Sequence, residues 1–111
     1  MYVNFMADNK EYKLRLNTRN TVLLEKQLGC NPLSIFGDGD TIPTITTMVA
    51  ILHAALQQYQ HSISLNDAYD IFDAWLAEEH AATEFIPIIL EVYKASGIIP
   101  KDKVEEEGKN E

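Results

Sequence analysis

The sequence contains no lysine or arginine between Lys26 and Lys94. The stretch between them has a formal charge of −9, in a chain whose net charge is −8. Proteins hold nucleic-acid backbones mainly with lysine and arginine side chains, which displace condensed counterions. Because the middle of the chain has neither, its composition excludes a phosphate-binding surface there and favours an acidic module that binds protein. The carboxylates of this stretch are Asp38, Asp40, Asp67, Asp70, Asp73, Glu78, Glu79, Glu84 and Glu91.

Cysteine and long apolar runs are also scarce. The single cysteine, Cys30, cannot form a disulfide within the chain, and the N-terminus shows no secretory leader, so we expect a cytosolic protein. The longest apolar stretches are interrupted by His53, Pro87 or Glu91 before they reach the roughly 18 residues of a membrane span. We therefore expect neither secretion nor a membrane partner.

The length and composition fit one globular domain. With 111 residues, 46% of them hydrophobic and 23% charged, the chain can bury a core without a metal or a disulfide. We expect a mainly α fold over residues 1–100, a small domain of about four helices with an N-terminal β-hairpin packed on it. Residues 101–111 are mostly charged, with Val104 as the one apolar side chain, and should form a flexible tail.

The first 16 residues show two alternating segments around a polar turn, which is the pattern of a β-hairpin. Val3 and Phe5 on the first segment, and Tyr12, Leu14 and Leu16 on the second, should face the core. Because an isolated hairpin is only marginally stable, this one should lie against helices.

The next segments are marked by their ends. Asn17 or Thr18 can cap a helix that stops at Gly29, a residue suited to the left-handed conformation that follows many helices. Residues 31–37 repeat this pattern in miniature, with asparagine, proline and a closing glycine, and should form one helical turn. A tight turn is expected at residues 38–40.

Two longer helices should carry most of the apolar residues. The first opens at Pro43, and its core stripe consists of Ile45, Met48, Val49, Leu52, Leu56 and Tyr59. The second is capped by Ser64 and has Asp67 in its first turn, where the helix dipole favours negative charge. Its apolar sector holds Leu65, Ala68, Tyr69, Ile71, Phe72, Trp75 and Leu76. Its opposite, acidic sector holds Asn66, Asp67, Asp70, Asp73, Ala77 and Glu78.

Residues 85–93 are apolar around most of a helical wheel. Thr83 can cap this last helix, Pro87 falls in or just after its first turn, and Gly97 ends it. A kinked continuation of the preceding helix is one alternative, and a buried strand is another because the segment contains several β-branched residues. A helix with so little polar surface is either central to the core or in contact with another chain.

No catalytic or metal-binding pattern emerges from the titratable residues. The aspartates at helical spacing, Asp67, Asp70 and Asp73, lie on a solvent face with no glycine-bearing loop to enclose a cation. The histidines lie on separate segments without the spacing of a zinc site; they are His53, His61 and His80. Cys30 could act as a nucleophile only with a positioned base and a lowered pKa; directly after a helix-ending glycine, we expect it to be a small, partly buried thiol. We therefore expect no enzyme, no metal and no cofactor.

Several of these structural motifs occur together in one known family. Residues 14–33 combine a basic strand, a helix ending in E-x-x-L-G and an N-P-L turn. In these features, and in the helical segments 45–56 and 64–73, the chain resembles the tail assembly chaperones of long-tailed (siphovirus-type) bacteriophages and prophages. The likeness covers about residues 11–98 and consists of caps and core positions rather than catalytic motifs.

The resemblance implies a binding role. Such a protein binds the long, helical tape measure protein in the host cytoplasm before the tail tube polymerises around it, and leaves before the virion matures. The tape measure protein is the implied partner, the tail tube protein is a second candidate, and a homo-oligomer is a further expectation. The family supplies no site residues. From the apolar surplus of the chain we expect contact residues at Trp75, Phe85, Ile88, Ile89, Val92 and Tyr93.

Two alternatives remain open, the first from the composition and the second from the resemblance. A stretch of charge −9 without any lysine or arginine could occupy a basic groove on a nuclease or repressor, as an antagonist that mimics nucleic acid. The chain could also be a structural subunit of a phage particle, which differs from a chaperone in remaining in that particle.

Overall fold

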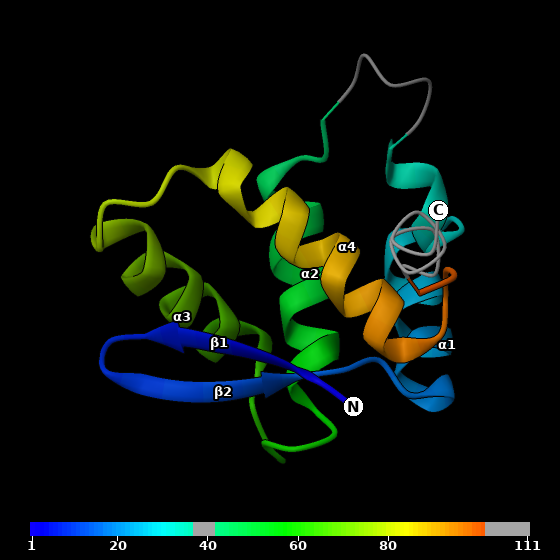
Figure 1. The fold of residues 1–111 in the computed structure, drawn as a ribbon, viewed down its shortest axis with the longest axis horizontal. Helices are drawn as coiled ribbons and strands as arrows, with labels where there is room; N and C mark the ends of the chain where they lie inside the picture. Colours follow the sequence, from blue (N-terminus) through cyan, green and yellow to red (C-terminus); the bar gives the residue numbers. More distant parts are fainter. Residues whose placement is uncertain (37–41, 102–111) are drawn as a thin grey trace, which may run out of the picture.

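The computed structural model describes residues 1–36 and 42–101. Within these residues an N-terminal antiparallel hairpin is followed by four α-helices, as the sequence predicts (Figure 1). The elements are β1 at Val3–Ala7, β2 at Lys10–Leu14, α1 at Thr18–Leu28, η1 (a 3-10 helix) at Pro32–Phe36, α2 at Ile45–Leu56, α3 at Leu65–Ala77, η2 (a second 3-10 helix) at Ala82–Glu84 and α4 at Phe85–Ser96. The turn expected at residues 38–40 and the tail expected at 102–111 lie outside the described residues.

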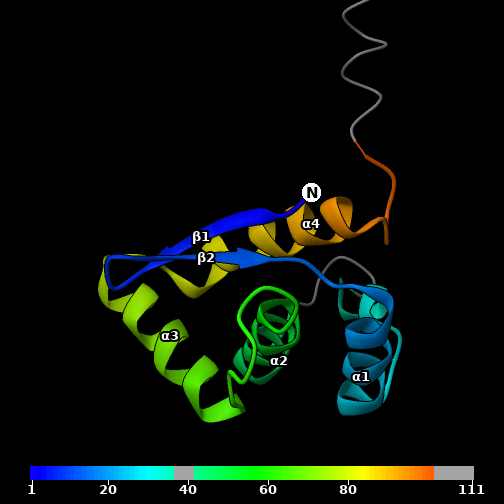
Figure 2. The ribbon, with the colours of Figure 1, turned by 90° about the horizontal axis from the view of Figure 1, so that it is seen from below.

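Helix α2 occupies the centre of the fold. Figure 2 shows α1, α2 and α3 side by side, with the hairpin and α4 lying across one side of this row. Helix α2 contacts α1, α3, α4 and β2. Its buried residues come from nearly every side of the helix; they are Met48, Val49, Ala50, Ile51, Leu52, Ala54, Ala55 and Leu56. The centre of the core is therefore α2. The sequence allowed the last helix to take this central position, but it does not.

The hairpin turns through two residues in the left-handed conformation. Asp8 and Asn9 have φ values of 54° and 63°, which aspartate and asparagine tolerate better than most residues. This turn sets the register that pairs Ala7 with Lys10 and Phe5 with Tyr12. Of the residues expected to face the core, Phe5, Leu14 and Leu16 are buried, and Val3 and Tyr12 are partly buried. Ala7 on the same face is buried as well.

Groups of the helical layer form hydrogen bonds with the free edge of β2 and with the two residues that follow Leu14. The Gln60 amide accepts a hydrogen bond from the Lys13 N–H at 2.8 Å and donates one to the Lys13 carbonyl at 2.9 Å, as a neighbouring strand would do. The Arg15 N–H donates to the Ala55 carbonyl at 3.0 Å, and the Leu16 N–H donates to Ser96 Oγ at 2.8 Å. The hairpin is thereby fixed to the end of α2 and to the end of α4.

The helix ends confirm most of the predicted caps. Asn17 caps α1, and the glycines that follow α1 and α4 have φ values of 74° and 80°. Ser64 and Asp67 form a reciprocal capping box at the start of α3. Thr83 does not cap α4, since this threonine lies within η2, and η2 leads directly into α4. Residues 85–96 are helical, so the strand alternative is wrong.

Two tyrosines that the helical stripes place in the core are exposed instead. Tyr59 lies beyond the end of α2 and is 38% exposed, while Tyr69 on α3 is 44% exposed. Tyr59 packs edge to face against Tyr2 of the N-terminal segment, with ring centroids 5.4 Å apart. Both tyrosines keep their hydroxyls in reach of water, which tyrosine prefers over an unpaired place in a core.

Replacing Ser64 with alanine should destabilise the fold. The substitution removes the acceptor for the Asp67 N–H, a bond of 3.0 Å, and an N-cap of this kind contributes about 1 kcal/mol. Thr83→Ala is the matched control, because this threonine makes no cap bond, and it should change the free energy of unfolding by less than about 0.5 kcal/mol. Urea unfolding measures both variants, and equal losses in the two would contradict the capping assignment.

The same box should give the fold a pH dependence. The Ser64 N–H, and after it the Ser64 hydroxyl, lower the pKa of Asp67 from its ordinary 3.8. A carboxyl whose pKa is lower in the folded state stabilises the fold above its unfolded pKa, and this stabilisation is lost as pH falls through the folded pKa. Asp67→Asn should therefore be less stable than the unmodified chain at pH 7. The gap should shrink below pH 3.8, and a gap that is constant with pH would rule the coupling out.

Candidate partner-binding surface

Most of the contact residues expected on the last two helices lie in the core. Of the six, only Ile88 is partly exposed. The exposed fractions of the other five are 3% or less; these residues are Trp75, Phe85, Ile89, Val92 and Tyr93. The reason is that α4 packs against β1 and α2, so its apolar face covers the fold's own centre. In this conformation the expected contact surface is not accessible to a partner.

Trp75 is covered by the linker that joins α3 to α4. The His80 ring stacks on the indole with centroids 4.5 Å apart and an angle of 8° between the planes. His80 Nδ1 lies 2.9 Å from Glu84 Oε1, and the other carboxylate oxygen of Glu84 accepts a hydrogen bond from the Ala81 N–H at 3.2 Å. The bond with His80, followed by that with Ala81, lowers the pKa of Glu84. The linker is thus held in place over the aromatic core.

Tyr93 joins α4 to the segment that follows α1. Its hydroxyl donates a hydrogen bond of 3.0 Å to the Pro32 carbonyl of η1, and its ring packs edge to face on Phe36. Burial, with a smaller contribution from the charge of Cys30, raises the pKa of Tyr93 well above its ordinary value. This tyrosine is therefore a structural tie between distant segments.

Exposed apolar side chains gather where the start of α2 meets α3. Ile45 is 47% exposed and Tyr69 is 44% exposed, and both line an open groove of about 320 Å³. Leu76 also lines it, and the buried side chains of Val49 and Phe72 form its floor. We call this the α2–α3 groove.

Two carboxylates stand at the edge of the α2–α3 groove. Asp70 and Asp73 line it and are exposed to solvent. Within residues 1–36 and 42–101, neither carboxylate makes a hydrogen bond or an ion pair. The groove thus combines an apolar floor with two negative charges that the described chain does not neutralise.

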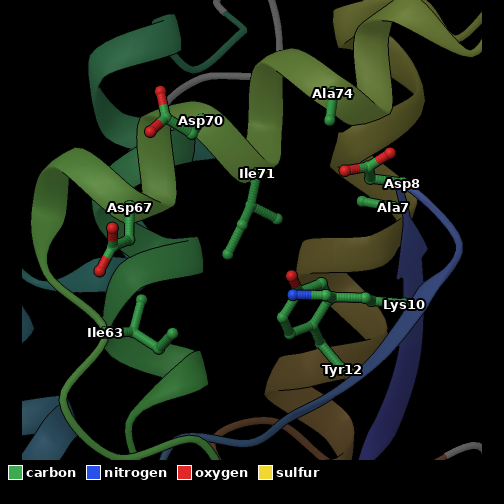
Figure 3. A pocket seen from close by; sticks show the side chains of 9 residues that line it. All are labelled: Ala7, Asp8, Lys10, Tyr12, Ile63, Asp67, Asp70, Ile71 and Ala74. Atoms are coloured by element: carbon green, nitrogen blue, oxygen red, sulfur yellow. The ribbon is translucent and has the colours of Figure 1, made fainter.

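A second groove lies on the other side of α3. It has a volume of about 300 Å³ and separates α3 from the hairpin. Figure 3 shows Ile71 of α3 and Tyr12 of β2 extending into it from opposite walls. Lys10 also lines this groove, and Asp67 is engaged in the capping box with Ser64. Helix α3 is consequently a ridge with Asp70 at its crest, since Asp70 lines both grooves.

The remaining candidate residues do not form a site. His53 Nε2 lies 3.1 Å from the Ile63 carbonyl oxygen, while His61 and Cys30 are exposed. In the described part of the chain, no group of three or more histidine, cysteine or acidic side chains is arranged to hold a metal ion. The helices of the same residues are too short or too polar to cross a lipid bilayer.

Sequence reasoning missed the α2–α3 groove because its members belong to apolar stripes. Ile45 is the first residue of α2, and Tyr69 lies at the border of the apolar sector of α3. A side chain in the first turn of a helix is covered only when another segment packs over it, which periodicity does not report. The polar end of Tyr69 was the signal that favoured the surface.

The chain belongs to a family of unknown function, DUF6096, whose match covers residues 4–110. No curated protein and no solved structure gives a significant match. The family therefore contributes no residue roles.

Replacing Ile89 by alanine should strongly destabilise the fold. Ile89 is fully buried, and shortening a buried aliphatic side chain to alanine costs about 2 to 5 kcal/mol. Its neighbour Leu90, which is 36% exposed, is the matched control, and Leu90→Ala should cost clearly less. Chemical unfolding of both variants measures this difference. A well-folded, equally stable Ile89→Ala protein would show that the core has been wrongly assigned.

Proposed function

We propose that this chain is a tail assembly chaperone of a long-tailed phage or prophage, acting in the host cytoplasm to keep the tape measure protein soluble. The resemblance of its caps and core motifs to that family is the first support. The observation that carries the proposal furthest is the α2–α3 groove, an exposed apolar surface beside Asp70 and Asp73. Its function is binding, and no reaction is assigned to it.

A chaperone of this kind covers the apolar helical faces of its client. A long helical client exposes apolar faces before its own assembly partners arrive, and such faces aggregate in water. A small helical domain can cover a client face with an apolar groove, while an acidic exterior keeps the complex soluble by charge repulsion. Helix α3 offers both properties on one element, with Tyr69 and Leu76 beside Asp70 and Asp73.

An acidic antagonist of a nucleic-acid-binding protein is the second candidate. The solvent-facing carboxylates of α3 favour it, because Asp70 and Asp73 make no ion pair within the described residues. Residues three apart on a helix are rotated by about 60° relative to one another, so successive carboxylates turn away from a single line of phosphate-like charges. The apolar groove between α2 and α3 has no role in such mimicry. We therefore favour the chaperone.

Co-expression with the tape measure protein tests the proposal. The tape measure protein of the same tail gene cluster should be insoluble alone and soluble when this chain is present, and the two should purify together. Because apolar contacts weaken little with ionic strength, the complex should persist from about 0.1 M to about 1 M salt.

Three results would count against the chaperone. A tape measure protein that stays insoluble in the presence of this chain would reject it directly. Binding that disappears at high salt would favour the antagonist, whose affinity depends on charge. Recovery of this chain in purified, mature particles would favour a structural subunit.

A further inference from the structure

We propose that the α2–α3 groove docks one amphipathic helix of the client, whose apolar stripe is flanked by lysine or arginine. This inference rests on the proposed function and specifies the chemistry of its partner. It replaces the buried residues of α3 and α4 with a surface made by the exposed Ile45 and Tyr69 and the partly exposed Leu76, with Asp70 and Asp73 beside them.

The walls of the groove favour a helix over an extended segment. Both walls are α-helices, and beyond the first-turn N–H groups of α2 the backbone groups along the walls are paired within the helices. An extended peptide placed there would find few backbone partners, and burial of unpaired backbone groups is costly. A helix satisfies its own backbone and presents only side chains, which is what an apolar groove can bind.

The edge of the groove favours cationic flanks. An uncharged partner would remove water from Asp70 and Asp73 without replacing its hydrogen bonds, and an acidic partner would add repulsion. Lysine or arginine next to the apolar stripe would supply charge-assisted hydrogen bonds to these carboxylates. The chain does not supply them from nearby in the sequence, since residues 27–93 contain no lysine or arginine.

The groove beside the hairpin fits this partner less well. Lys10 lines it and would repel a cationic flank, and Asp67 is already bonded to the Ser64 N–H at 3.0 Å. The α2–α3 groove has neither feature, because the residues lining it include no base and its two carboxylates have no partner among the described residues. The complementary charge therefore selects the α2–α3 groove.

Binding of designed peptides tests the chemistry. One labelled 20-residue helix carries a leucine stripe flanked by lysines, a second has the same stripe flanked by glutamates, and a third is the lysine peptide with its stripe scrambled. Fluorescence anisotropy with the full chain should give the highest affinity for the lysine-flanked helix and an affinity at least roughly tenfold lower for the other two. Equal binding of the lysine and glutamate helices would overturn the charge argument, and equal binding of the scrambled peptide would overturn the helical one.

Surface variants test the location. Ile45→Ser and Tyr69→Ser change exposed residues of the groove and should each weaken binding of the lysine-flanked helix severalfold. Asp70→Asn combined with Asp73→Asn should remove most of the preference for lysine over glutamate flanks. Leu90→Ser on α4 is the matched control, because Leu90 is exposed and does not line the groove, and it should bind as the unmodified chain does. A loss at Leu90 equal to that at Tyr69 would reject the groove.

A second copy of this chain is the competing occupant. Helix α1 presents Val22 and Leu23, 40% and 55% exposed, with Arg19 and Lys26 one turn away on either side. If a copy fills the groove, Leu23→Ser should abolish self-association seen by analytical ultracentrifugation and should raise the affinity for the peptide. That result would overturn the client assignment, whereas a monomer with unchanged peptide affinity supports it.

The co-expression experiment separates this inference from the proposed function. If the unmodified chain keeps the tape measure protein soluble and Tyr69→Ser does so equally well, the groove is wrong while the chaperone stands. If the unmodified chain does not keep the client soluble, the proposed function fails even where a designed helix binds the groove.

Discussion

The need to cover α2 on nearly every side determines the rest of this structure. Eight of the twelve residues of α2 are buried, so no single neighbouring layer could satisfy this helix. The hairpin, α1, α3 and α4 each take one part of its surface, and β2 is held to its end by Gln60 and by the Ala55 carbonyl. A marginal two-stranded hairpin is stable here because the helices both bury its apolar face and pair its free edge.

The same requirement separates core from surface on the outer helices. The apolar face of α4 packs against the centre of the fold, which is why Ile89 and Val92 are fully or almost fully buried. Cover is incomplete at the start of α2, where Ile45 remains 47% exposed and lines a groove together with Tyr69 of α3, which is 44% exposed. The surface available to a partner therefore consists of apolar side chains that core packing leaves uncovered. It lies at a helix end and not along the most apolar segment.

Features encoded by neighbouring residues could be predicted from the sequence, whereas features set by packing could not. The box of Ser64 with Asp67, the stops after α1 and α4 and the N-terminal hairpin follow from local chemistry and are present as predicted. Whether a residue of an apolar stripe is buried depends on which other element packs against it. Periodicity gave Tyr69 and Trp75 the same sector of α3, yet the first is 44% exposed and the second 3%, because only Trp75 meets Phe5 and Phe85.

The absence of lysine and arginine from the middle of the chain leaves the carboxylates of α3 without a basic neighbour on the same helix. A lysine four residues after an aspartate on a helix would pair with it, but Asp70 and Asp73 are followed at that spacing by Ala74 and Ala77. The positions four residues before them hold Asn66 and Tyr69, which cannot neutralise a carboxylate either. Helix α3 thus keeps its charges uncompensated beside an apolar groove. Such an arrangement adds nothing to the stability of the isolated chain. A partner that carries lysine or arginine could form ion pairs with these carboxylates.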